Sequence, residues 1–145
     1  MLNYNQALPK NILIQDLQMK EIQPIMKLIV RGKKREFISA VGKSLNILLP
    51  TESNTSTQSD KLTALWLSPD EWMIYSNEPV DKNTNIYETE KILNKSISKL
   101  NLGAIVDVTD QFVMINLKGN KIYELFQFGS PFNFNDFQNK KGAVT

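Results

Sequence analysis

The sequence predicts an α+β fold, with a ferredoxin-like split β-α-β unit followed by a partial second β-α unit. Short segments with alternating apolar residues predict strands, and longer segments with apolar residues every three or four positions predict helices. Between residues 25 and 109 these segments follow the order β-α-β-β-α-β, which predicts an antiparallel sheet with its helices on one face. We expect one domain over 1–145, with an N-terminal extension at 1–24 and the partial second unit at 112–145.

The first predicted unit contains four strands. Residues 25–31 form the first, with Met26, Leu28 and Val30 expected on one face. Two further strands, at 62–67 and 72–76, are joined by a Ser-Pro-Asp-Glu turn and should form an antiparallel hairpin. The fourth strand is expected at 104–109.

Two helices connect these strands. Residues 33–45 carry Phe37, Val41 and Leu45 at four-residue spacing, which predicts a helix with one apolar stripe. Residues 86–100 predict the second helix, with Asn85 and Glu88 as a capping pair. The polar segment 51–60 lacks large apolar residues and is expected to be a mobile surface loop.

Outside the first unit the signals are weaker. Residues 12–19 alternate imperfectly and predict an edge strand, and residues 112–118 predict another strand. A short helix is expected at 120–128, with Ile122, Leu125 and Phe126 facing inward. A second unit of this length is incomplete, so its edge strand and half-covered helix would need another chain or a longer sequence to bury them.

Composition limits the possible chemistry. The chain has neither Cys nor His, which excludes disulfides, thiolate metal sites, a Cys nucleophile and a Ser-His-Asp triad. The net charge is only +2 and Lys greatly outnumbers Arg, so neither nucleic acid nor an anionic membrane is an expected partner. There is no apolar signal segment and no run long enough to span a bilayer, so a cytoplasmic location is expected.

Two pairs of carboxylates are candidates for acid-base or metal chemistry. Asp70 and Glu71 lie beside two tryptophans, but adjacent turn residues usually point apart, and ordinary turn formation explains them better. Asp107 and Asp110 would suit a cation or an amine. Without further ligands at metal spacing, a structural role near the strand end is the better explanation.

Two other features have both a functional and a structural explanation. Arg31-Gly32 and the basic residues 33–35 precede a helix, where phosphate groups often bind, but no phosphate-binding motif is present. The aromatic residues between Phe126 and Phe137 are too dense for a small core, so we expect some of them to anchor an interface. We assign no catalytic, cofactor-binding or metal residue to this chain.

Several stretches resemble the gamma subunit of heterotetrameric sarcosine oxidase. The most specific is ALWLSPDEW at residues 64–72, which is similar to the family's ALWLGPDEW hairpin. Residues 31–50 are similar to its RG, F, AVG, L and LP pattern, and residues 106–131 to its VDVTD, LKG and GCP motifs. Ser130 replaces the usual Cys of the last motif. Family members usually continue well past a segment such as 137–145.

The resemblance implies a fold related to the folate-binding domain of aminomethyltransferases, such as the glycine-cleavage T-protein. It implies a non-catalytic subunit that supports assembly of a complex converting sarcosine to glycine. FAD, FMN, NAD and tetrahydrofolate would then bind to the alpha and beta subunits, and none to this chain, whose partners would be the alpha, beta and delta subunits. Exposed edges would also allow the isolated chain to self-associate.

Two other function classes stay open. The chain would be a stand-alone folate-binding or aminomethyltransferase-like protein if Asp107 or Asp110 bound the pterin. It would be a generic ferredoxin-like ligand-binding module if aromatic and basic residues alternated on the central strands, but those strands alternate only aliphatic residues. Which amine the complex oxidises does not follow from the sequence.

Overall fold

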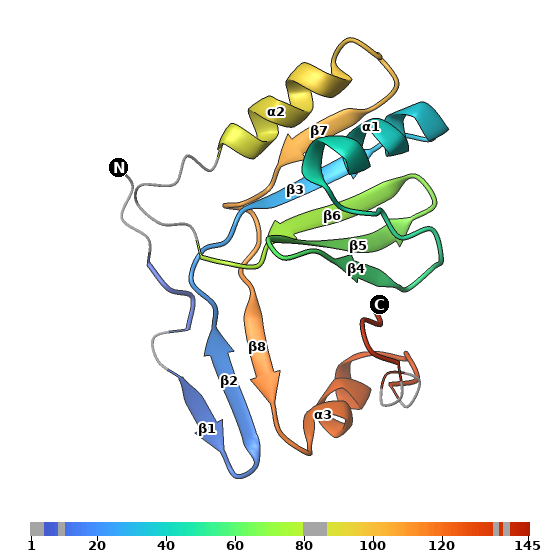
Figure 1. Cartoon of the computed structure of the whole chain (residues 1–145). Helices are drawn as coiled ribbons and strands as arrows, with labels where there is room; N and C mark the ends of the chain where they lie inside the picture. The colour runs from blue at the N-terminus through green and yellow to red at the C-terminus, as the bar shows by residue number, and fades with distance from the viewer. Residues whose placement is uncertain (1–4, 9–10, 80–86, 135–136, 138–139) are drawn as a thin grey trace. The chain divides into compact units, whose positions relative to one another are not determined.

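The computed structural model of the chain describes residues 5–8, 11–79, 87–134, 137 and 140–145 (Figure 1). Two antiparallel sheets and three helices within these ranges confirm the predicted α+β class. The chain separates into two compact units. Unit 1 comprises Met1–Gln23 and Phe112–Lys141, and unit 2 comprises Pro24–Gln111 and Gly142–Thr145.

Unit 2 contains a five-stranded antiparallel sheet with the order β4-β5-β6-β3-β7. β3 lies between β6 and β7, so it is an interior strand of this sheet. The strands are β3 (Lys27–Arg31), β4 (Ser56–Gln58), β5 (Leu62–Ser68), β6 (Glu71–Ser76) and β7 (Ala104–Asp107).

Two helices, α1 (Arg35–Leu45) and α2 (Tyr87–Ile97), pack against each other on the same side of this sheet (Figure 1). The apolar residues that alternate along the strands face them, as the period-two pattern of a half-buried strand requires. Together they form one core. Its buried members are Met26, Leu28, Val30, Phe37, Val41, Ile47, Leu49, Ala64, Trp72, Ile74, Leu93 and Ile97.

The ring of Phe37 is fully buried in this core, against two glycines. A Cβ atom at Gly32 would lie 2.5 Å from the Phe37 ring, and one at Gly103 would lie 2.3 Å from the ring and 2.4 Å from the Arg31 carbonyl oxygen. Glycine is therefore required at both positions by close approach of the ring.

The structure corrects three predicted boundaries in unit 2. The segment 51–60 is not only a loop, because β4 pairs with β5 and Thr55 forms a β-bridge with Ala143. Polar Ser and Thr side chains concealed this strand. The last strand ends at Asp107 instead of Thr109. The second helix ends at Ile97, and its predicted cap residue Asn85 lies outside the described residues.

Unit 1 contains a three-stranded antiparallel sheet with the order β1-β2-β8, and helix α3 (Ile122–Gly129). The edge strand predicted at 12–19 is in fact a hairpin of β1 (Ile12–Ile14) and β2 (Leu17–Glu21). Its turn was missed because the left-handed residue is Gln15, with φ of 49°, instead of a glycine or asparagine. β8 (Ile115–Lys118) is shorter than the predicted strand 112–118.

The Phe37 contacts predict that Gly103→Ala will destabilise unit 2. The added Cβ would overlap both the ring and the Arg31 carbonyl oxygen, and overpacking of this kind costs about 1–3 kcal/mol of unfolding free energy. Urea denaturation followed by Trp fluorescence will measure the loss. Gly129→Ala is the control, because a Cβ there meets no atom within 4 Å. An equal midpoint for both variants would contradict the packing role of Gly103.

Candidate partner interface

One face of the unit 1 sheet is apolar. Antiparallel register places Ile12 opposite Met19, and Met19 opposite Leu117. Because side chains alternate between the two faces of a strand, residues that share this face can be read from the register. Glu21, which is opposite Ile115 and 5% exposed, lies on it with six apolar residues. We call the six apolar residues the apolar face: Ile12, Ile14, Leu17, Met19, Ile115 and Leu117.

This apolar face is incompletely covered. Ile14 is 61% exposed and Ile115 is 41% exposed, while its other members are partly buried. The opposite face carries Gln18, Lys20 and Lys118, so it has the polarity of a solvent-facing surface, with exposed Leu13 as an exception. An apolar sheet face beside exposed apolar residues of the same unit is typical of a protein interaction site.

Helix α3 extends the exposed apolar surface of unit 1. It contains no buried residue, and Phe128 is 90% exposed. The prediction that Leu125 and Phe126 face inward is therefore wrong, since they are 42% and 39% exposed, and Ile122 is only partly buried. Unit 1 provides too few elements to cover both sides of this short helix.

The aromatic segment packs partly against itself. Phe134 is buried, and its ring centroid lies 5.1 Å from that of Phe126 and 5.3 Å from that of Phe132. Tyr123 and Phe137 complete the cluster at 6.5 Å and 6.0 Å from Phe134. Several aromatic residues that were candidates for an interface therefore pack against one another within this cluster, whereas Phe128 remains exposed.

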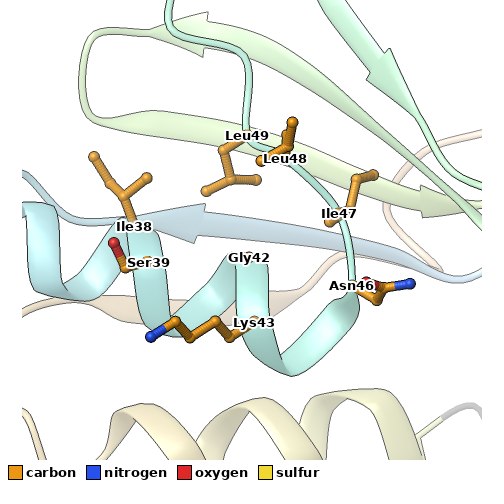
Figure 2. Close-up of a pocket in the computed structure, with 8 residues that line it drawn as sticks. All are labelled: Ile38, Ser39, Gly42, Lys43, Asn46, Ile47, Leu48 and Leu49. Carbon is orange, nitrogen blue, oxygen red and sulfur yellow. The ribbon is translucent and has the colours of Figure 1, made fainter.

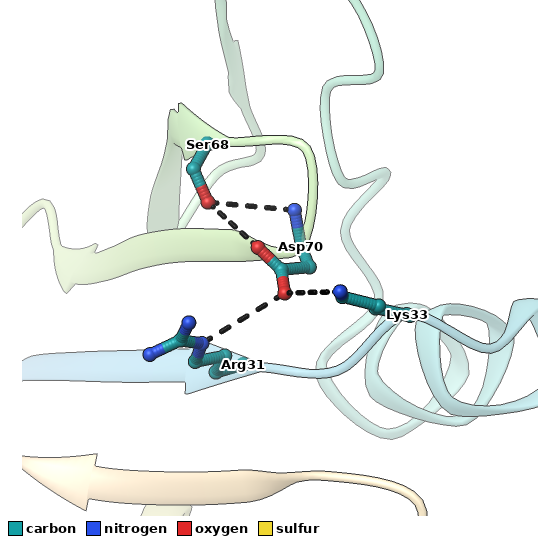
Figure 3. Close-up of polar contacts among 4 residues, drawn as sticks. All are labelled: Arg31, Lys33, Ser68 and Asp70. Atoms are coloured by element: carbon teal, nitrogen blue, oxygen red, sulfur yellow. Dashed lines mark hydrogen bonds and ion pairs between the residues drawn. The ribbon is translucent and has the colours of Figure 1, made fainter.

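Asp70, the first candidate carboxylate, connects the β5–β6 turn to the end of β3 (Figure 3). Ser68 donates a hydrogen bond of 2.9 Å to Asp70 Oδ1, while Arg31 Nε and Lys33 Nζ each lie 3.8 Å from Oδ2. The Gly32 amide donates to the Asp70 carbonyl at 2.9 Å. Glu71 pairs across the strands with Arg31. These contacts give Asp70 a structural role in the turn.

The second carboxylate pair lies near a buried lysine that sequence analysis did not single out. Lys27 is 3% exposed, and its Nζ donates to the carbonyl oxygens of Ile25 and Thr109 at 3.1 and 3.0 Å. Asp107 Oδ1 accepts a hydrogen bond from the Thr109 amide at 2.8 Å. Burial lowers the pKa of Lys27 below 10.5, and the charges of Asp110 and Asp107 oppose that shift. The alternation that predicts Met26, Leu28 and Val30 on the core face puts Lys27 on the other face of the strand, so no sequence signal indicated its burial.

Among the described residues, no group of three or more His, Cys, Asp or Glu side chains is placed to hold a metal ion. A shallow groove of about 450 Å³ runs beside α1 in unit 2 (Figure 2). Its lining is largely apolar, with Lys43 at its side. The lining residues are Ile38, Ser39, Gly42, Lys43, Asn46, Ile47, Leu48 and Leu49.

No helix in the described part of the chain is both long and apolar enough to cross a membrane.

The sequence matches no protein-family model, and no curated protein matches it. The fold defines a small α+β protein, and solved structures share it, among them a chain that matches with a TM-score of 0.68. That chain belongs to a heterotetrameric sarcosine oxidase from Corynebacterium sp. U-96, solved in complex with pyrrole 2-carboxylate. Sequence identity is 17%, so the likeness shows the fold. The match covers 81% of this chain but only 57% of the solved chain.

The geometry of Asp70 predicts a small effect of Asp70→Asn on stability. Arg31 and Lys33 side chains are 65% and 82% exposed, and ion pairs with exposed partners contribute about 0–1 kcal/mol. The amide oxygen of Asn can still accept the hydrogen bond from Ser68. Urea denaturation at low and high salt will measure the loss, which should shrink as salt rises. A loss that salt does not change would contradict an ion-pair role.

The surroundings of Lys27 predict a pH dependence of stability. Because its pKa is lower in the folded state than the unfolded value of 10.5, the unfolded chain binds more protons between these two values. The contribution of Lys27 to the free energy of unfolding should therefore rise with pH up to about 10.5. Urea denaturation from about pH 8 upward should show a stability gap between wild type and Lys27→Met that changes in this direction. Lys33→Met, at an exposed side chain, should show no such trend.

Proposed function

We propose that this chain is a non-catalytic subunit of a heterotetrameric sarcosine oxidase-type complex, in the position of its gamma subunit. The observation that carries the proposal is the exposed apolar surface of unit 1, formed by the apolar face and the exposed residues of α3. A chain of similar fold belongs to such a complex, which supports other subunits of the complex as the partners of this surface. The motifs at 31–50, 64–72 and 106–131 point to the same family.

The absence of Cys and His from the sequence favours an assembly role over catalysis. Neither residue is available to attach a flavin or to act as a neutral-pH imidazole base. In the proposed complex the alpha and beta subunits would carry FAD, FMN, NAD and tetrahydrofolate, with the delta subunit as a further partner. This chain would contribute contact area and fix the geometry of its partners.

The proposed contact is a permanent one. Obligate interfaces commonly bury more than about 2,000 Å² and are more apolar than transient ones. The apolar face alone is a small patch, so α3 and its exposed Phe128 should belong to the same interface. Aromatic residues in such positions often contribute most of the binding energy.

Co-expression with the products of the neighbouring genes tests the proposal. We expect flavin-binding subunits among these products, and we expect this chain to elute with them from a size-exclusion column. Oxidation of sarcosine by the complex should depend on the larger subunits and not on this chain alone. Elution of the chain by itself, with folded partners present, would contradict the proposal. Turnover by the purified chain would contradict it as well.

Substitution of exposed residues will locate the interface. Phe128→Ser in unit 1 should weaken complex formation by at least about 30-fold, since loss of an anchoring aromatic commonly costs about 2 kcal/mol or more. Because Phe128 is 90% exposed, its loss should leave the stability of the isolated chain nearly unchanged. Leu48→Ser is the matched control: Leu48 is 82% exposed but lies in unit 2. A stronger effect of the Leu48 variant would place the interface on unit 2.

A further inference from the structure

The chain passes between the two units three times, after Gln23, after Gln111 and after Lys141. The first two passages connect strands that are consecutive in the chain, because β2 leads into β3 and β7 leads into β8. β2 pairs with β8 in unit 1, and β3 pairs with β7 in unit 2. The first two passages therefore leave unit 2 from the same end of one strand pair.

Lys27 lies at this end of the β3–β7 pair. Its backbone amide donates to Thr109 Oγ1 at 3.0 Å, and its carbonyl oxygen accepts from the Val108 amide at 2.9 Å. Its Nζ adds the two bonds to the carbonyl oxygens of Ile25 and Thr109. One residue thus joins the passage before β3 to the passage after β7 through both its backbone and its side chain.

The Asp107-Val108-Thr109-Asp110 stretch completes the arrangement. Asp107 caps the Thr109 amide, which holds the Thr109 carbonyl and hydroxyl toward Lys27. Asp110 contributes a negative charge near the buried ammonium group, and such a charge favours its protonated form. The stretch has no part in the proposed interface, and its contacts with Lys27 come from Thr109 and the Val108 amide.

We infer that Lys27, with Thr109, is a latch that holds together the first two passages between unit 2 and unit 1 and limits the motion of unit 1. The third passage is attached to unit 2 separately, because the Val144 amide donates to the Asn54 carbonyl oxygen at 3.0 Å and Ser56 Oγ donates to the Gly142 carbonyl oxygen at 2.8 Å. The closest tie on the unit 1 side of the first two passages is the bond from the Ile22 amide to the Met114 carbonyl oxygen, at 2.9 Å. Hinges are often formed by a few residues at the ends of structural elements. With the latch closed, the hinge at the first two passages is confined to the short stretches between these two ties. With the latch open, it extends to the ends of β3 and β7.

Hydrogen exchange measured by NMR provides the first test, on the full chain. Lys27→Met keeps the length and apolar stem of the side chain but removes its N–H donors. We expect the amides of Val108 and Gln111 to exchange at least about tenfold faster, while the Ile38 amide in α1 keeps its rate. Lys33→Met is the matched control, because Lys33 is exposed and lies outside the latch. Faster exchange of all three amides by the same factor would identify Lys27 as a general stabiliser of unit 2 and overturn the inference.

A distance measurement provides the second test. The sequence contains no cysteine, so Lys43→Cys in α1 and Gln127→Cys in α3 would place one spin label on each unit. The distribution of distances between the labels should broaden in Lys27→Met and keep its width in Lys33→Met. The inference requires both faster local exchange and a broader distribution, and failure of either result overturns it.

Thr109 provides an independent pair of variants if Lys27→Met does not fold. Thr109→Val removes the hydroxyl that meets the Lys27 backbone, and Thr109→Ser retains it. Faster exchange at Val108 and a broader distribution in the Val variant, with neither in the Ser variant, would support the latch. Equal behaviour of the two variants would overturn it.

Discussion

Unit 2 depends on the space that Gly32 and Gly103 leave for the ring of Phe37. Gly32 belongs to the connection between β3 and α1, and Gly103 to the connection between α2 and β7. The ring therefore fixes both helices against the interior strand of the sheet. The Gly32 amide also donates a hydrogen bond to the Asp70 carbonyl oxygen in the β5–β6 turn. Because these contacts meet around one buried ring, unit 2 has a well-defined core without any contribution from metal or disulfide.

The described residues of unit 1 form no comparable core. Its three short strands and one eight-residue helix offer little area to bury, and small structures hide a smaller share of their apolar surface than large ones. The rings near Phe134 pack against it, but the apolar face is incompletely covered and Phe128 remains exposed. This difference between the units favours unit 1 as the contact surface of the proposed complex. The same apolar exposure provides a route for the isolated chain to self-associate.

Much of unit 2 could be predicted because local sequence and burial agree there. Leu28 and Val30 alternate on β3, and Phe37 and Val41 recur on α1, so period alone located these elements. β4 could not be predicted, because its residues are Ser, Thr and Gln and show no apolar alternation, although its partner β5 lies close in sequence. The hairpin of β1 and β2 was hidden by a turn without glycine. The inward face of α3 was predicted wrongly because helical spacing shows which residues share a side, not whether anything covers it.

The candidate sites show the same limit. Carboxylates near a strand end suggested that this site binds a cation or an amine. In the structure the nearby positive charge is the ammonium group of Lys27, which lies 82 residues before Thr109 in the sequence. The exposed apolar face was likewise concealed, since Ile12 and Leu117 meet only through the pairing of β1 and β8 with β2. Sequence separation, rather than unusual residue chemistry, kept both sites from being recognised.

A buried lysine costs free energy unless hydrogen bonds and nearby charges offset its desolvation. An apolar residue at position 27 would avoid this cost, but it would not connect the carbonyl oxygens of Ile25 and Thr109. The lysine is therefore best explained by the connection it makes. With the inferred latch closed, unit 1 would sample fewer orientations before it binds its partner. It would then lose less conformational freedom on binding, which increases affinity. A subunit whose proposed role is assembly would gain from such a restraint on the unit that carries its contact surface.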